Sequence, residues 1–332
     1  MTVRLISFTD RGEALANRLA EGLGGEAMRC GRPLSLDAWT AQSFETAEGL
    51  IYVGAAGIAV RAIAPYVRSK TQDPAVVVVD ETGRFSISLL SGHLGGANEL
   101  ACRAAELCGA VPVITTATDR NGVFAVDSWA RMQGCVIENP RRIQEISARL
   151  LAGGTVRISS QWPIAGELPK GVLLTGEQDC DVLLTLSRKP WDGLRIIPKI
   201  AVLGIGCKKN ASQGAIEAAF RTACEKAGID DENAVKMVCS IDRKAQEPGL
   251  LDFCRSHGFP FHTYTAEQLQ GVEGSFTSSA FVREITGVDN VCERSAVLGS
   301  GGKLYLKKQT GDGVTMAVAL EPFHPDWRWR YE

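Results

Sequence analysis

The sequence has few of the residues from which metal sites and disulfide frameworks are built. Its 332 residues include only four histidines, three of them in the last quarter, and no two of its ten cysteines have the C-x-x-C spacing. Metal and redox sites are recognised by such spacings. We therefore expect no metal bound by protein side chains, and we interpret the cysteines as reduced residues that pack as small hydrophobic groups.

A long apolar run and an excess of one charge are also absent. No segment approaches the roughly 20 apolar residues that span a bilayer. The 36 basic and 38 acidic side chains give a net charge of −2, so neither nucleic acid nor a membrane is expected as a partner. The first 24 residues have the pattern of a strand and a helix rather than of a signal peptide, which predicts a cytoplasmic protein.

Short apolar strands alternate with helices along most of the chain, and this alternation predicts an α/β fold. We expect N- and C-terminal α/β domains, with parallel or mixed sheets flanked by helices, and a small β-rich middle segment. Residues 75–80 and 84–90 form apolar strand patterns on either side of the turn residues Glu81-Thr82-Gly83. This arrangement predicts a hairpin, so the first sheet is expected to be mixed.

The pattern changes between residues 153 and 198. Strand-like segments there are separated by proline, glycine and charged turns, with little sign of helix. We therefore divide the chain into an N-terminal α/β domain (1–135), a middle segment or connector (136–198) and a C-terminal α/β domain (199–332). Two strands joined by a Gly-Asp-Gly hairpin are expected near the end of the last domain.

Three segments share one pattern, in which an apolar strand runs into a glycine-rich loop and a helix start. They are LIYVGAAGIAV (50–60), SLLSGHLGGANEL (88–100) and AVLGIGCKKNA (201–211). Ligands of open α/β sheets bind beyond the carboxyl ends of strands, and a helix start there suits phosphate or carboxylate. The GxGxxG and GxxxxGK[ST] motifs of nucleotide sites are missing. A tight turn without a ligand is the alternative for each loop taken alone.

The middle loop contains His93, which is the histidine best placed for chemistry. Near a helix start the dipole favours the neutral imidazole, which can act as a base at neutral pH. A cap histidine without chemistry is the alternative. Asn98 and Glu99 begin the following helix, where Glu99 complements the dipole whatever else it does. Cys207, beside two lysines, is a candidate activated thiol, but no histidine lies near it in the sequence.

Seven blocks of the sequence resemble one known family. They are VGAAGIAVRAIAPYVRSKTQDPAVVVVDETG, GHLGGANELA, TTATDRNGVFAVD, VLGIGCKKNAS, IDRKAQEPGLLDF, SAFVREITGVDNVCERSAVLG and LKKQTGDGVTMAVAL. In this order, over about residues 50 to 320, they resemble the cobalt-precorrin-5A hydrolases, the CbiG family of the anaerobic route to cobalamin. The last four blocks also resemble the CobE-type protein of the aerobic route.

The resemblance implies a substrate and a reaction. The substrate is a cobalt tetrapyrrole whose ring A acetate is tied as a δ-lactone to the extruded meso carbon. Hydrolysis with water opens the lactone and releases that carbon with its methyl group as acetaldehyde, which gives cobalt-precorrin-5B. No cofactor is implied, because the cobalt arrives with the substrate, and neighbouring precorrin methyltransferases are implied partners. A non-catalytic carrier of an unstable tetrapyrrole intermediate is the alternative, and a nucleotide-dependent enzyme is a third that the missing motifs disfavour.

This chemistry selects the candidate site residues. Attack of water on a lactone needs a general base and donors for the oxyanion. We expect His93 as the base, backbone amides around Gly95 and Gly96 as the donors, and Glu99 and Glu293 as further acid–base candidates, although a helix-surface role for Glu293 is equally open. The residues expected to receive the substrate and its carboxylates are Gly54, Gly57, Arg61, Gly92, Gly95, Gly96, Asn98, Asp119, Arg120, Gly204, Gly206, Cys207 and Lys208.

Overall fold

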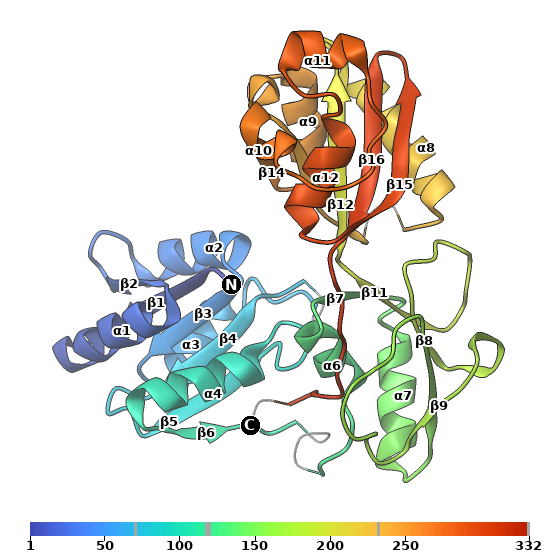
Figure 1. Ribbon diagram of the computed structural model, residues 1–332. Helices are drawn as coiled ribbons and strands as arrows, with labels where there is room; N and C mark the ends of the chain where they lie inside the picture. Colours follow the sequence, from blue (N-terminus) through green and yellow to red (C-terminus); the bar gives the residue numbers. More distant parts are fainter. Residues whose placement is uncertain (70–71, 117–120, 231–232, 331–332) are drawn as a thin grey trace.

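Three sheets, each accompanied by helices, organise the protein. The computed structural model describes residues 1–69, 72–116, 121–230 and 233–330. The sheets have six, five and five strands, and they form three lobes along the chain (Figure 1). The predicted α/β fold class, with a β-rich part between two α/β parts, is confirmed.

The N-terminal sheet is mixed, because one hairpin reverses its direction. Its strand order is β2-β1-β3-β4-β5-β6. The strands are β1 (Val3–Ser7), β2 (Glu26–Arg29), β3 (Gly49–Val53), β4 (Ala75–Val79), β5 (Phe85–Leu90) and β6 (Val111–Val113). As predicted, β4 and β5 pair antiparallel, whereas the other neighbours are parallel. β5 and β6 therefore run opposite to β1–β4.

Two helices pack on each face of this sheet. They are α1 (Asp10–Leu23), α2 (Leu36–Thr46), α3 (Ala56–Ile63) and α4 (Ala97–Cys108). Leu19 of α1 and Leu100 of α4 share a core on one face, whereas Trp39 of α2 and Ile63 of α3 belong to the core on the other face. The five residues of β4 are all buried because both faces are covered, which explains the uninterrupted apolar sequence of that strand.

The middle sheet has the strand order β7-β11-β10-β8-β9, and only β7 runs antiparallel to its neighbour. The strands are β7 (Cys135–Glu138), β8 (Val156–Ser160), β9 (Val172–Leu174), β10 (Val182–Leu184) and β11 (Leu194–Pro198), with α6 (Val126–Met132), α7 (Arg142–Leu151) and the 3-10 turn η1 (Glu177–Asp179). Phe124 and Trp129 are fully part of this core. The packing boundary therefore lies about ten residues before the division expected at residue 135.

The C-terminal sheet has the strand order β14-β13-β12-β16-β15. The strands are β12 (Ala201–Cys207), β13 (Val235–Ile241), β14 (Phe261–Tyr264), β15 (Lys303–Gly311) and β16 (Val314–Leu320). The helical elements are α8 (Gln213–Ala227), η2 (Asp242–Lys244), α9 (Pro248–His257), α10 (Ala266–Gln270), α11 (Ala280–Thr286) and α12 (Cys292–Ser300). β15 and β16 form the predicted Gly-Asp-Gly hairpin, and Phe220 of α8 and Phe253 of α9 fill the main core.

The chain does not end in the C-terminal lobe. After β16, residues 321–330 run back to the other lobes, as the dark red segment of Figure 1 shows. Trp327 stacks on Trp129 with ring centroids 5.2 Å apart, and the Trp129 indole N–H donates to the Asp326 carbonyl at 2.6 Å. The expected domain 199–332 is thus split, because its last residues belong to the core of the middle sheet. No helix in the described ranges has the length and apolarity of a membrane span.

Candidate active site

A cavity of about 220 Å³ lies where the loop after β5, helix α4, helix α6 and the C-terminal tail meet. Its wall is made by Gly92, His93, Asn98, Glu99, Cys102, Ile114, Ser128, Arg131, Met132, Trp329 and Arg330. The cavity lies beyond the carboxyl ends of β5 and β6, which are parallel to each other. The rule that places ligands at carboxyl ends therefore holds for this strand pair.

His93 is paired with a carboxylate that the sequence did not indicate. Nδ1 of His93 lies 3.2 Å from Oδ2 of Asp127, in the first turn of α6, and both side chains are largely buried. The other oxygen of Asp127 accepts the backbone N–H of Ser128 at 3.0 Å. A carboxylate at Nδ1 favours the imidazole tautomer that carries its lone pair on Nε2. This geometry equips His93 to accept a proton.

The glycines of the loop allow close packing of its backbone against neighbouring residues. A Cβ at Gly95 would lie 2.3 Å from Cβ of Ser91, and one at Gly96 would lie 2.6 Å from the Arg131 guanidinium. Gly96 has φ 86° and Ser91 has φ 57°, so the chain is left-handed on both sides of His93. The Gly96 N–H donates to the His93 carbonyl at 3.0 Å, and this internal bond argues against the expected oxyanion role of that amide.

Asn98 and Glu99 both lie in the cavity wall, as the sequence led us to expect. Asn98 accepts the Ser88 hydroxyl at 2.7 Å and donates to the Thr116 hydroxyl at 3.3 Å, so it ties α4 to the chain on either side. Its Oδ1 would lie 2.7 Å from a Cβ at Gly92. Glu99 accepts a hydrogen bond from the Arg131 guanidinium across the cavity.

The first glycine loop lies at the other end of the sheet. Gly54 follows the carboxyl end of β3, and its N–H donates to the carbonyl of Val79, the last residue of β4. The register pairs Leu90 with Val76, near the beginning of β4. Because β5 is antiparallel, the loop that holds Gly54, Gly57 and Arg61 and the loop that holds His93 lie at opposite edges of the sheet. The structure therefore does not bring Gly54, Gly57 and Arg61 together with His93.

The candidates of the C-terminal domain are also separate from the cavity. Gly204 is required for packing, because a Cβ there would lie 1.8 Å from the Cys292 carbonyl oxygen of α12. Gly206 accepts the Thr315 hydroxyl at 3.1 Å. Burial raises the pKa of the Cys207 thiol, which argues against an activated nucleophile. Lys208 pairs with Asp312 at 3.4 Å. Two further candidates, Asp119 and Arg120, lie outside the described residues.

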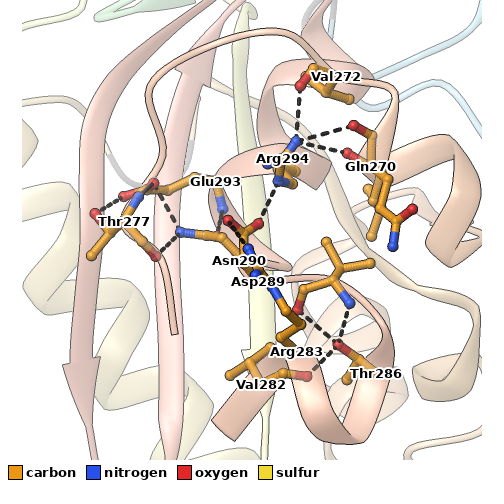
Figure 2. A network of polar contacts seen from close by, with 12 residues as sticks. Gln270, Val272, Thr277, Val282, Arg283, Thr286, Asp289, Asn290, Glu293 and Arg294 are labelled. Carbon is orange, nitrogen blue, oxygen red and sulfur yellow. Dashed lines mark hydrogen bonds and ion pairs between the residues drawn. The ribbon is translucent and has the colours of Figure 1, made fainter. Parts of the chain in front are cut away.

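Glu293 is a buried structural carboxylate, which corrects its expected acid–base role. It has no solvent exposure, and four donors surround it; Figure 2 shows its contacts with Thr277 and Asn290. Its oxygens accept the Thr277 N–H at 2.6 Å, the Thr277 hydroxyl at 2.8 Å, the Asn290 amide at 2.9 Å and the Lys308 N–H at 2.6 Å. These bonds tie α12 to β15 and to the segment before α11, and Glu293 is not part of the wall of the His93 cavity.

Comparison with known proteins places the chain. Three family models match it in order: "Cobalamin synthesis G N-terminal" over residues 38–119, "Cobalamin biosynthesis central region" over 124–182 and "Cobalamin synthesis G C-terminus" over 201–319. A cobalt-precorrin-5A hydrolase of Salmonella typhimurium is 34% identical over 344 residues, which cover 96% of this chain and 97% of the relative. The chain belongs to the cobalt-precorrin-5A hydrolase family.

The family predicted from the sequence is thereby confirmed, and with it the prediction of an enzyme. A second family member, the cobalt-precorrin-5A hydrolase of Priestia megaterium, is 31% identical over 84% of this chain and 80% of its own length. A solved structure of a cobalamin biosynthesis protein G homolog from Sulfolobus solfataricus has 21% identity, 97% coverage of each chain and a TM-score of 0.44. The central family model begins at residue 124, where the core of the middle sheet also begins.

Proposed function

We propose that this member of the cobalt-precorrin-5A hydrolase family opens the ring A δ-lactone of cobalt-precorrin-5A and releases the extruded carbon as acetaldehyde. The observation that carries the proposal is the His93–Asp127 pair at the wall of a cavity. Hydrolysis of a lactone needs a positioned base, histidine is the side chain most often used for this role, and a carboxylate at Nδ1 orients it.

Each step assigns a proton and an electron pair. Nε2 of His93 accepts a proton from water while the water oxygen attacks the lactone carbonyl. Collapse of the tetrahedral intermediate breaks the ring C–O bond and gives a carboxylate and a hydroxyl on the extruded carbon. The proton on His93 returns to the leaving alkoxide as this hydroxyl forms. Nε2 of His93 then accepts the hydroxyl proton while the aldehyde C=O forms and the C–C bond to the macrocycle breaks, and the electron pair of that bond enters the conjugated macrocycle. Water is consumed and acetaldehyde leaves.

The cavity dimensions support entry by only part of the substrate. Pockets that enclose a drug-sized ligand measure roughly 300–1,000 Å³, whereas this cavity measures about 220 Å³. The cavity is thus smaller than a site that encloses a whole tetrapyrrole, and in this proposal a single ring at the periphery of the substrate enters it. The lactone is such a peripheral ring. Arg131, whose guanidinium is held by Glu99 in the same wall, supplies positive charge for the developing oxyanion.

Cobalt is part of the substrate in this proposal. Among the described residues, no group of three or more histidine, cysteine, aspartate or glutamate side chains is arranged to hold a metal ion. None of the ten cysteines, all of which lie in described ranges, forms a disulfide, in keeping with a reducing compartment such as the cytoplasm. The precorrin methyltransferases that act before and after this step are the proposed partners for substrate transfer.

The decisive experiment measures acetaldehyde after the purified protein is mixed with the lactone intermediate. We expect one equivalent per substrate from the wild type. His93→Asn and His93→Ala remove the base and are expected to slow single-turnover release at least about 100-fold, while both variants still bind the intermediate. A wild type that binds the intermediate without releasing acetaldehyde is a carrier, and variants with wild-type rates place the base elsewhere.

A further inference from the structure

The C-terminal tail reaches the cavity of the N-terminal lobe, and it is firmly anchored on the way. The Ala165 N–H donates to the Pro325 carbonyl at 2.8 Å, and the Trp327 N–H donates back to the Ala165 carbonyl at 3.0 Å. The side chain of Gln133, the residue after α6, accepts the Asp326 N–H at 3.0 Å and donates to the Asp326 carboxylate at 3.2 Å. These bonds and the stacked Trp327 fix the direction of the residues that follow.

Trp329 and Arg330 are the tail residues that enter the cavity wall beside His93. Trp329 packs edge-on against Phe124, with ring centroids 6.1 Å apart. The Arg330 guanidinium lies over the indole of Trp329, 5.2 Å from its centroid. The aromatic ring thus holds the arginine at the cavity through a cation–π contact.

Arg330 differs from the neighbouring arginines in its ion pairing. Arg131 is paired with Glu99 in the cavity, and Arg328 is paired with Asp326 at 2.7 Å. Within the described ranges, no carboxylate lies within ion-pair distance of Arg330, which is exposed. A guanidinium that is oriented by an aromatic face and has no acidic partner is suited to bidentate binding of a carboxylate.

We infer that Arg330 determines specificity by binding a peripheral carboxylate of the macrocycle, and that Trp329 is the positioning residue that holds it. This inference rests on the proposed function. The cavity admits one ring, so the acetate and propionate groups next to that ring lie at the cavity mouth. Arg330 captures one of them there, and the lactone is thereby directed toward His93. The C-terminal tail, which follows the last strand of another domain, completes the site.

The test compares Arg330→Gln with the control Arg328→Gln. The control removes the same charge from an exposed side chain two residues away. Acetaldehyde release is measured against substrate concentration. Loss of one charge-assisted hydrogen-bonded pair is expected to raise KM about tenfold or more in Arg330→Gln, with kcat within about threefold of the wild type. Arg330→Lys recovers part of this loss, whereas Arg328→Gln keeps the wild-type KM. Trp329→Leu is expected to raise KM as well.

A substrate analogue whose peripheral carboxylates are converted to amides identifies the group that Arg330 binds. The wild type is expected to bind this analogue about tenfold more weakly than the acid, whereas Arg330→Gln does not distinguish the two. Equal KM values for Arg330→Gln and Arg328→Gln in an active enzyme overturn the inference and leave the proposed function intact. A wild type that releases no acetaldehyde overturns the proposed function instead, and this assignment with it.

Discussion

Oδ2 of Asp127 lies 3.2 Å from Nδ1 of His93, although 34 residues separate them in the chain. His93 belongs to the loop that follows β5 of the N-terminal sheet, and Asp127 to a helix that packs on the middle sheet. The pair therefore forms only when the two lobes are in contact. The proposed base and the residue that orients it are thus supplied by different lobes.

Replacement of Asp127 by Asn tests this pairing. The amide keeps the size of the side chain but no longer favours hydrogen on Nδ1, so the imidazole loses its preference for the reactive tautomer. We expect single-turnover acetaldehyde release to fall at least about tenfold, with unchanged affinity for the intermediate. The ¹⁵N NMR shifts of the His93 ring report the tautomer directly. A slower variant with an unchanged tautomer would show that Asp127 acts through folding alone.

Replacement of Glu293 by Gln is expected to destabilise the C-terminal domain without affecting chemistry. The carboxylate accepts four hydrogen bonds, and an amide NH₂ in place of one oxygen faces donors that it cannot satisfy. We expect a loss on the order of 3 kcal/mol in the free energy of unfolding, measured by urea denaturation. Glu284→Gln on the exposed side of α11 is the matched control. A folded Glu293→Gln protein that has lost kcat would restore the acid–base role.

Substitution of Gly204 by Ala is expected to separate α12 from β12. The added Cβ would lie 1.8 Å from the Cys292 carbonyl oxygen, so the helix has to move. Overpacking of this kind costs about 1–3 kcal/mol. Gly214→Ala in α8 adds the same methyl group where no atom lies within 4 Å, and it is expected to stabilise by about 0.5–1 kcal/mol. Similar denaturation midpoints for the two variants would contradict the packing role of Gly204.

The acid stability of the middle domain is expected to depend on Asp181. Partial burial acts to raise the pKa of this carboxyl, but hydrogen bonds from Arg157 and Arg149 outweigh it and hold the pKa below its ordinary value. A lowered folded-state pKa stabilises the fold above the unfolded value of about 3.9 and loses this contribution as the pH falls through the folded value. Asp181→Asn removes the contribution at every pH.

The difference in unfolding free energy between wild type and Asp181→Asn is therefore expected to stay constant from pH 7 to about 5 and to narrow below about pH 4. Urea denaturation at several pH values measures it. Asp192→Asn, a carboxylate that is 99% exposed, serves as the control. A difference that is independent of pH would show that the Asp181 charge does not stabilise the fold.

The positions of the strands could be predicted from the sequence because periodicity is a local property. Which loops lie next to one another in the fold could not be predicted. The alternation of residues 84–90 and the turn before them predicted the β4–β5 hairpin correctly. Because this hairpin makes β5 antiparallel to β4, Gly92 and Gly54 lie at opposite ends of the strands. Two glycine loops with the same local pattern thus serve different ends of one sheet. A pattern of strand, loop and helix does not record the direction of the strand.

The residues that complete the site carried no signal of their own in the sequence. Asp127 has the position of an ordinary acidic residue in the first turn of a helix. Trp329 and Arg330 lie in a segment beyond the last strand, more than 200 residues from His93. Their proximity depends on packing between distant segments, which spacing along one chain does not encode. The buried network around Glu293 was not predicted for a related reason, because a single helix position does not reveal donors on β15 and on the segment at Thr277.

The crossing of the chain between lobes has a consequence for modularity. The polypeptide enters the C-terminal lobe at Ile200 and leaves it at Glu321, where the Glu321 N–H donates to the Ile200 carbonyl at 3.0 Å. Entry and exit are thus neighbours, and residues 201–320 form a cassette spliced into the middle domain. Insertion at adjacent chain ends leaves a host fold intact. A short splice from Ile200 to Glu321 would therefore rejoin the host chain, but it would also uncover Leu186 and Ile197, which pack in the core of the inserted lobe.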